Sequence, residues 1–356
     1  MWISKIFTVL IFLSCSQLVL AQDSLISVEL QHMHRFAETY VKMENYKMAI
    51  ATYKQLIELS PENIQLKTEL GDTYFRSGDY DNATATLSPL QDLPHVTYKA
   101  YEVMAAAQLA QHKDKLSKST VERGLARFPD AGALYYLKGT TASAENQMAA
   151  AVQNWLTGIE VQPGYAANYK AAAVAYLNTS ESLWGILYGE TYLAIPHDST
   201  GNAAFKTMLY NGWSAYFEHI TDKHDHSTPF EEMVRSTLLQ LTPIISDGMS
   251  VENLTMVRTR FLMEWSNRYA TKYPFPLFTY QEELIRNGLM DTYSEWLLGM
   301  AESKSGYEAW NKFHTNDMHR FEKWREEHFM WPAQMTTYVD KSDVKMHELF
   351  PKKKKR

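Results

Sequence analysis

The sequence predicts an all-α fold: a superhelix of about five helical hairpins, followed by a helical C-terminal domain. Three observations predict it. A set of aromatic and small residues recurs after 34 residues: Tyr40, Tyr46, Ala49 and Tyr53 are followed by Tyr74, Tyr80, Ala83 and Leu87. Prolines recur at spacings of 33, 35, 34 and 33 residues: Pro61, Pro94, Pro129, Pro163 and Pro196. Between prolines, apolar residues recur three and four apart, which is typical of helices.

Each repeating unit is predicted to contain two helices. A break such as Gly78-Asp79-Tyr80 lies midway between prolines, and each proline ends the second helix because proline cannot continue an established helix. Small residues are expected where two helices approach closely: Gly71, Ala83, Ala105, Gly139, Ala151 and Ala173. Large residues are expected to fill the space between helices and units: Tyr53, Leu87, Val121 and Trp155.

These residues resemble the tetratricopeptide repeat, whose pattern is a large residue, Leu-Gly, Tyr, Ala, an aromatic and Pro. The second repeat matches best, through Leu70-Gly71, Tyr74, Gly78, Tyr80 and Ala83. The third departs, with Gln108 for the tyrosine and Ser117 for the alanine, and the fifth has Gly185 for the alanine. The resemblance places the repeats at residues 24–197.

The resemblance implies that the hairpins stack and that the first helix of each lines a concave surface, which binds an extended or helical segment of another protein. The residues expected on this surface are His34, Glu38, Asp72, Glu102, Tyr136 and Lys170. A partner with a basic stretch is the hypothesis. The alternative is that the acids are a solvated helix face. Some family members clamp a peptide carboxylate here, but Glu38 and Glu69 replace the required asparagines, and only Lys99 fits.

Residues 198–350 lose the period and are predicted to form a second all-α domain. Helices are expected at residues 202–220, 230–245, 251–270, 280–301 and 315–329, because apolar residues keep helical spacing there. Most tryptophans lie in this half, and a core between helices is the favoured interpretation. The alternative is a glycan-binding surface of exposed tryptophans. Trp324 and Trp331 lie among charged residues, so they are the two expected to be exposed.

The chain shows no motif that supports catalysis, and we expect a non-enzymatic protein without a cofactor. A metal-dependent hydrolase is the alternative. The densest group of metal-ligand residue types is His219, Asp222, His224, Asp225 and His226, with weaker groups at His314, Asp317 and His319 and at His32 and His34. A solvated loop is the favoured interpretation of the densest group. The Ser342 to Lys345 spacing is interpreted as accidental rather than catalytic.

Residues 1–21 are predicted to be a signal peptide, with a short apolar core and small residues before Gln22. Export to a periplasm or cell envelope is therefore expected, with a lipid anchor at Cys15 as the less favoured alternative. No later segment is apolar enough to span a membrane. The chain carries a net charge of −6, and residues 351–356 form a basic tail that we expect to be solvated or to touch an anionic envelope surface. Because of its net negative charge, the chain is not expected to bind nucleic acid.

Overall fold

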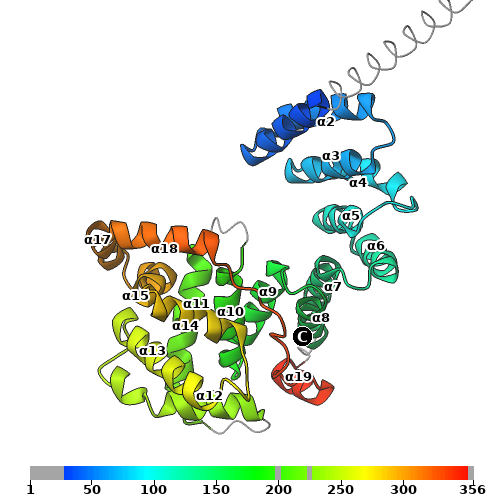
Figure 1. The fold of residues 1–356 in the computed structure, drawn as a ribbon. Helices are drawn as coiled ribbons and strands as arrows, with labels where there is room; N and C mark the ends of the chain where they lie inside the picture. Colours follow the sequence, from blue (N-terminus) through cyan, green and yellow to red (C-terminus); the bar gives the residue numbers. More distant parts are fainter. Residues whose placement is uncertain (1–27, 197–201, 223–226, 352–356) are drawn as a thin grey trace, which may run out of the picture. The chain divides into compact units, whose positions relative to one another are not determined.

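The computed structural model describes residues 28–196, 202–222 and 227–351, and all regular structure in these ranges is helical (Figure 1). The predicted all-α class is confirmed. The chain divides into two compact units, one ending at Gly124 and one beginning at Leu125. The predicted domain boundary at residues 197–198, the signal peptide and nearly all of the basic tail lie outside the described residues.

The first unit consists of stacked helical hairpins (Figure 1). A helix that ends at residue 42 pairs with α2 (Tyr46–Leu59). The second hairpin joins α3 (Ile64–Arg76) to α4 (Tyr80–Leu87) and the short 3-10 helix η1 (Ser88–Leu90). The third joins α5 (Tyr98–Ala110) to α6 (Asp114–Arg127), which continues past the end of the unit at Gly124. The hairpins follow the predicted period.

The turn inside each of the first four hairpins repeats at the same interval of 34 residues. Its key residue adopts a left-handed backbone conformation, with φ of 56° at Glu44, 82° at Gly78, 57° at His112 and 59° at Asn146. Only the second repeat supplies the glycine that this conformation favours. The backbone period is therefore more regular than the sequence period, and three turns carry a side chain where glycine would be less strained.

We expect His112→Gly to raise the free energy of unfolding by about 1 kcal/mol, because glycine removes the steric cost of a positive φ at this turn. Urea denaturation followed by circular dichroism measures the change. Ala106→Gly, inside α5, is the control and should lower stability by about 1 kcal/mol, since glycine disfavours a helix interior. A destabilised His112→Gly variant would contradict the interpretation of the turn.

The third repeat departs from the pattern, and the structure shows how its polar replacements are accommodated. Ser117, which replaces the alanine, is fully buried, and its hydroxyl donates to the Ala105 carbonyl at 2.9 Å. Gln108, which replaces the tyrosine, accepts a hydrogen bond from the Thr120 hydroxyl at 2.8 Å. Each departure therefore joins the two helices of the hairpin by a hydrogen bond, which offsets the cost of burying a polar group.

The second unit begins with two further hairpins. The first joins α7 (Gly132–Ala144) to α8 (Met148–Val161), and the next joins α9 (Ala166–Leu177) to α10 (Ser182–Ala194). α10 is complete although Gly185 replaces the expected alanine. A Cβ at this position would lie 2.6 Å from the Leu177 side chain, so the glycine lets the two helices approach.

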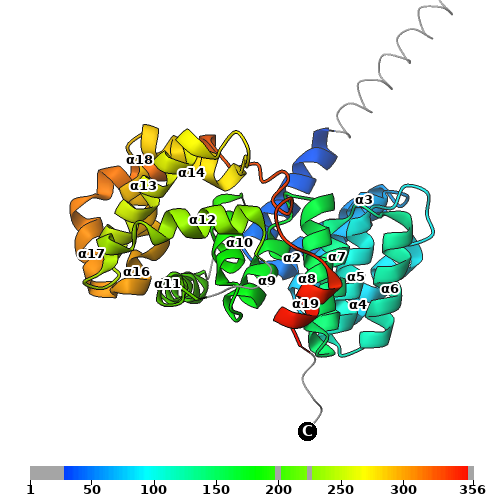
Figure 2. The same ribbon diagram turned by 90° about the horizontal axis from the view of Figure 1, so that it is seen from below.

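The rest of the second unit is helical, as predicted. Its main helices are α11 (Ala203–Glu218), α12 (Pro229–Leu239), α13 (Val251–Arg268), α14 (Pro276–Arg286), α17 (Lys304–Phe313), α18 (Thr315–Glu327) and α19 (Asp343–Leu349). The 3-10 helix η2 (Thr242–Ile245) follows α12. α19 returns to pack beside α8 (Figure 2). The sequence did not predict α17 or α19 as helices.

The single helix predicted at residues 280–301 is wrong. α14 ends at Arg286, and Gly288 turns the chain with φ of 64°. Three short pieces follow: α15 (Met290–Ser294), the π-helix η3 (Glu295–Gly299) and α16 (Met300–Glu302). A glycine with positive φ ends a helix readily, which apolar spacing alone did not reveal.

The tryptophans of the second unit lie mainly in its core. Trp213, Trp265 and Trp324 are buried, so the expectation that Trp324 would be exposed is wrong. Its ring packs against Tyr280 at a centroid distance of 5.4 Å and stacks on His328. Trp331 is exposed as predicted, with 64% of its surface accessible. It is the only exposed tryptophan among the described residues, which argues against a glycan-binding surface made of several exposed tryptophans.

Within the described ranges, no helix combines the length and the apolar character that crossing a membrane requires.

Candidate functional site

The first helices of the first unit carry the predicted acidic residues. Glu38 lies on the helix that ends at residue 42, Asp72 on α3 and Glu102 on α5. Glu38 is exposed, whereas Asp72 and Glu102 are half-buried. Glu69, also on α3, connects the first helices of the first two hairpins, because its carboxylate contacts the His34 Nε2 atom at 2.6 Å.

A lysine lies between two of the predicted acids. The Lys99 ammonium group is 3.5 Å from the Asp72 carboxylate and 3.3 Å from that of Glu102, and Arg76 donates to Asp72 at 2.7 Å. Burial by itself would lower the pKa of Lys99, but Glu102 and Asp72 together raise it above its ordinary value. The acidic face is therefore partly neutralised within its own unit. Sequence reasoning considered Lys99 only as a clamp residue and did not consider Arg76.

Tyr53 of α2 shows that the carboxylates share one electrostatic environment. Its pKa is raised, first by burial and then by the negative charges of Glu69, Glu38 and Asp72. Three carboxylates from two successive first helices therefore act on one hydroxyl group. This surface, defined by Glu38, Glu69, Asp72 and Glu102, is called the acidic face below.

Lys99 also bears on the carboxylate clamp of the repeat family. It fits that pattern, but its ammonium group already contacts two carboxylates of its own unit. An incoming carboxylate would have to compete with both.

The last two predicted residues, Tyr136 and Lys170, lie in the second unit, on α7 and α9. The Tyr136 ring is 6.1 Å from that of Tyr165. The Lys170 ammonium group lies over the rings of Tyr192 and Phe205, at 5.3 and 5.7 Å from their centroids. Lys170 is therefore engaged by aromatic rings of its own unit, although it remains half-buried rather than enclosed.

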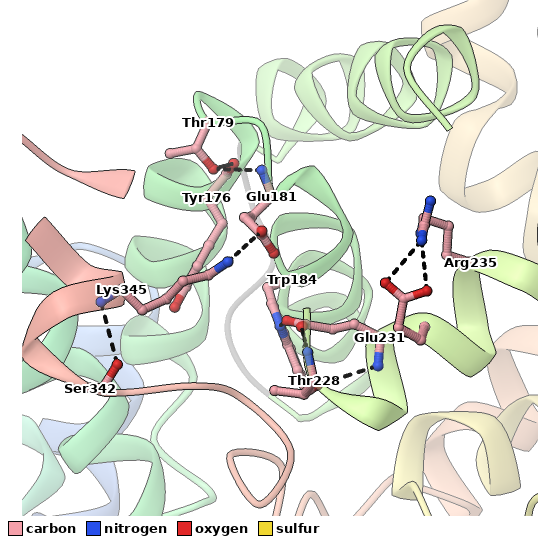
Figure 3. Close-up of polar contacts among 10 residues, drawn as sticks. Tyr176, Thr179, Glu181, Trp184, Thr228, Glu231, Arg235, Ser342 and Lys345 are labelled. Atoms are coloured by element: carbon pink, nitrogen blue, oxygen red, sulfur yellow. Dashed lines mark hydrogen bonds and ion pairs between the residues drawn. The ribbon is translucent and has the colours of Figure 1, made fainter. Parts of the chain in front are cut away.

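A buried polar cluster in the second unit has a structural explanation (Figure 3). The Lys345 ammonium group of α19 pairs with the Glu181 carboxylate at 2.7 Å, and both side chains are almost fully buried. Glu231 caps α12 through the Thr228 backbone N–H and also accepts from the Trp184 indole. Burial, and then Glu181, raise the pKa of Glu231. The cluster fastens α19 to the start of α10.

The Ser342 to Lys345 spacing is a helix cap. The Ser342 hydroxyl accepts from the Lys345 backbone N–H at 3.3 Å at the start of α19, while the Lys345 ammonium group binds Glu181 (Figure 3). Serine is a favoured residue at this position for that reason. The spacing therefore reflects helix capping and not a serine activated by lysine.

The candidate metal ligands are only partly described. His219 Nδ1 lies 3.0 Å from the Asp222 carboxylate, and both side chains are exposed. His224, Asp225 and His226 lie outside the described residues. Within the ranges that the structure describes, no group of three or more His, Cys, Asp or Glu residues has a geometry that could hold a metal ion.

The family-model comparison agrees with the hairpin architecture of the first unit. The family model of the tetratricopeptide repeat matches residues 40–95. Two solved structures, both described as crystal structures of MamA, are similar at 20% and 19% identity. They cover 44% and 46% of this chain and 92% and 90% of their own, with TM-scores of 0.35 and 0.36. No curated protein sequence matches. The chain therefore contains a tetratricopeptide repeat segment, at the residues 40–95 that match the family model.

Proposed function

We propose that the protein is a non-enzymatic scaffold that binds a segment of another protein on the faces of its first helices. The supporting observation is the acidic face, which continues over three successive first helices of the first unit. Its four carboxylates exceed the two cations that neutralise it, Lys99 and Arg76. A partner segment with basic side chains fits this excess of negative charge.

Tyr136 and Lys170 occupy corresponding faces of the first helices α7 and α9 by register. They would add aromatic and aliphatic contact for a partner segment, in either an extended or a helical conformation. We propose a periplasm or cell envelope as the location of this interaction, because a signal peptide is predicted, and the basic tail would contact an anionic surface there.

The test is a quantitative capture experiment from native envelope extract. The bait is the chain from Gln22 onward, and the site variant carries Glu38→Gln, Asp72→Asn and Glu102→Gln. Neutral amides are preferable to lysines, because new positive charges would repel Lys99. We expect a protein that is captured by the wild-type bait to fall by about 10-fold or more with the site variant.

A matched control removes the same number of carboxylates elsewhere in the first unit: Glu58→Gln, Glu62→Gln and Glu122→Gln, all at exposed positions. This variant should capture the partner as the wild type does. Thermal melting checks that all three baits are folded. Equal capture by the site variant and the wild type would remove the acidic face from the binding surface.

A further inference from the structure

A groove in the second unit has no role in the repeat architecture. It has a volume of about 820 Å³ and lies between α13 on one side and α15, η3, α17 and α18 on the other. One face of α13 lines it over about 18 Å, the length of twelve residues of helix. The side chains of α13 that reach it include Glu252, Thr255, Met256, Thr259, Arg260 and Met263.

The floor of the groove offers hydrogen-bond acceptors. Thr292 lines the groove and is only 4% exposed. Its hydroxyl has no hydrogen-bond partner among the described residues. Thr255 is also buried, and its hydroxyl donates to the Val251 carbonyl at 2.6 Å, so its lone pairs remain available. Both hydroxyl oxygens can accept a hydrogen bond from a ligand that donates in this groove.

The charged groups favour a cation. Four carboxylates line the groove, those of Glu252, Asp291, Glu295 and Asp317, against the guanidinium groups of Arg260 and Arg320. Arg320 is already engaged, by Asp317 at 3.6 Å and by the Gly288 carbonyl at 3.0 Å.

Glu295, the first residue of η3, is half-buried, and its carboxylate makes no hydrogen bond to the residues that the structure describes. Burial and the charges of Glu302 and Asp291 raise its pKa, while His314 opposes them. A cation bound at Glu295 would relieve this repulsion.

One wall of the groove is aromatic and planar. The Trp310 and His314 rings stack with a centroid distance of 4.3 Å and an interplanar angle of 7°. The His314 Nδ1 atom lies 2.9 Å from the Trp310 carbonyl, which assigns a proton to Nδ1 and holds the imidazole against the indole. A flat π surface beside a carboxylate attracts planar cations more strongly than compact ones.

We propose that this groove binds the guanidinium group of an arginine side chain presented by a partner protein. The guanidinium carries five N–H donors in one plane, so it can donate to Glu295 and reach the Thr292 hydroxyl. Its face can lie against the Trp310–His314 pair, in a cation–π contact. A bare metal ion fits poorly, because the described residues hold no group of three ligands with suitable geometry.

The test uses the full chain labelled with 5-fluorotryptophan and observed by ¹⁹F NMR. The Trp310 signal is assigned by its disappearance in Trp310→Phe. Titration with acetyl-Gly-Arg-Gly-amide should shift this signal in a saturable manner. The citrulline peptide, which keeps the shape but lacks the charge, and the lysine peptide, which keeps the charge but lacks the plane, should each bind at least about 10-fold more weakly.

Glu295→Gln should also weaken binding of the arginine peptide by about 10-fold, since it removes the acceptor charge and keeps the shape. Asp291→Asn, at an exposed position of the same groove, is a second variant with little effect expected on folding. Glu326→Gln, exposed at the far end of α18, is the matched control and should bind as the wild type. The proposal is overturned by an unshifted Trp310 signal, by equal binding of citrulline, or by unchanged affinity in Glu295→Gln. Because Trp310 reports only on this groove, the result is independent of the acidic face.

Discussion

Glu190→Leu is expected to lower the free energy of unfolding by about 3–5 kcal/mol, because it leaves a buried arginine without its counter-charge. Glu190 of α10 is 1% exposed and lies in the core of the second unit. Its carboxylate accepts from Arg258 of α13 at 2.5 Å and from Gln281 of α14 at 2.6 Å. The Trp213 indole and the Tyr293 hydroxyl donate to it at 3.0 and 3.3 Å.

The substitution should therefore weaken the contacts of α10 with four other helices, α11, α13, α14 and α15. Urea denaturation, followed by tryptophan fluorescence and by circular dichroism, measures it. The double variant Glu190→Leu with Arg258→Met is the matched control. It removes both charges and keeps the volume, so it should be more stable than Glu190→Leu alone. A single variant as stable as the wild type would mean that the pair is accessible to water in solution.

The repeat could be predicted from the sequence because it depends on local, periodic features. The break at Gly78, the proline at Pro94 and the apolar spacing between them lie within one hairpin. The turn conformation then recurs even where the glycine is absent, as at His112. Repeats contact mainly their neighbours, so a short-range pattern determines most of the first unit.

The second unit could be predicted only as helical, because contacts between distant segments determine its arrangement. Trp324 is buried by Tyr280, which lies 44 residues earlier, and its charged neighbours in sequence gave the opposite expectation. α19 is held by the pair between Lys345 and Glu181, which are 164 residues apart. No spacing within α19 indicates that partner.

The position of the acidic face could be predicted from the sequence, but its partial neutralisation by Lys99 could not. The 34-residue register places Glu38 and Asp72 at equivalent positions of successive first helices. The register does not reveal that Lys99 reaches back to Asp72, since this contact depends on how α3 and α5 pack. The groove beside α13 was missed for the same reason: its walls come from helices that follow one another at irregular intervals.

Gly71→Leu is expected to lower the free energy of unfolding by about 3 kcal/mol, because a side chain at this position must enter space that Leu87 occupies. A Cβ added at Gly71 would lie 2.5 Å from the Leu87 Cγ atom, closer than packed carbon atoms approach. Leu87 is fully buried between α3 and α4, so it has little room to move. The two helices of the second hairpin would have to separate, and thermal melting measures the loss.

Three further variants separate this steric effect from a general cost of added leucine. Lys47→Leu, at an exposed position of α2, should change stability by no more than about 0.5 kcal/mol. Leu87→Ala alone removes buried contacts and should cost about 2–5 kcal/mol. In the double variant Gly71→Leu with Leu87→Ala, the new leucine can fill the space that Leu87 leaves. The loss of stability should therefore be smaller than the sum of the losses in the two single variants. An additive double variant, or an unchanged melting temperature for Gly71→Leu, would contradict the close packing of α3 on α4 on which the repeat register depends.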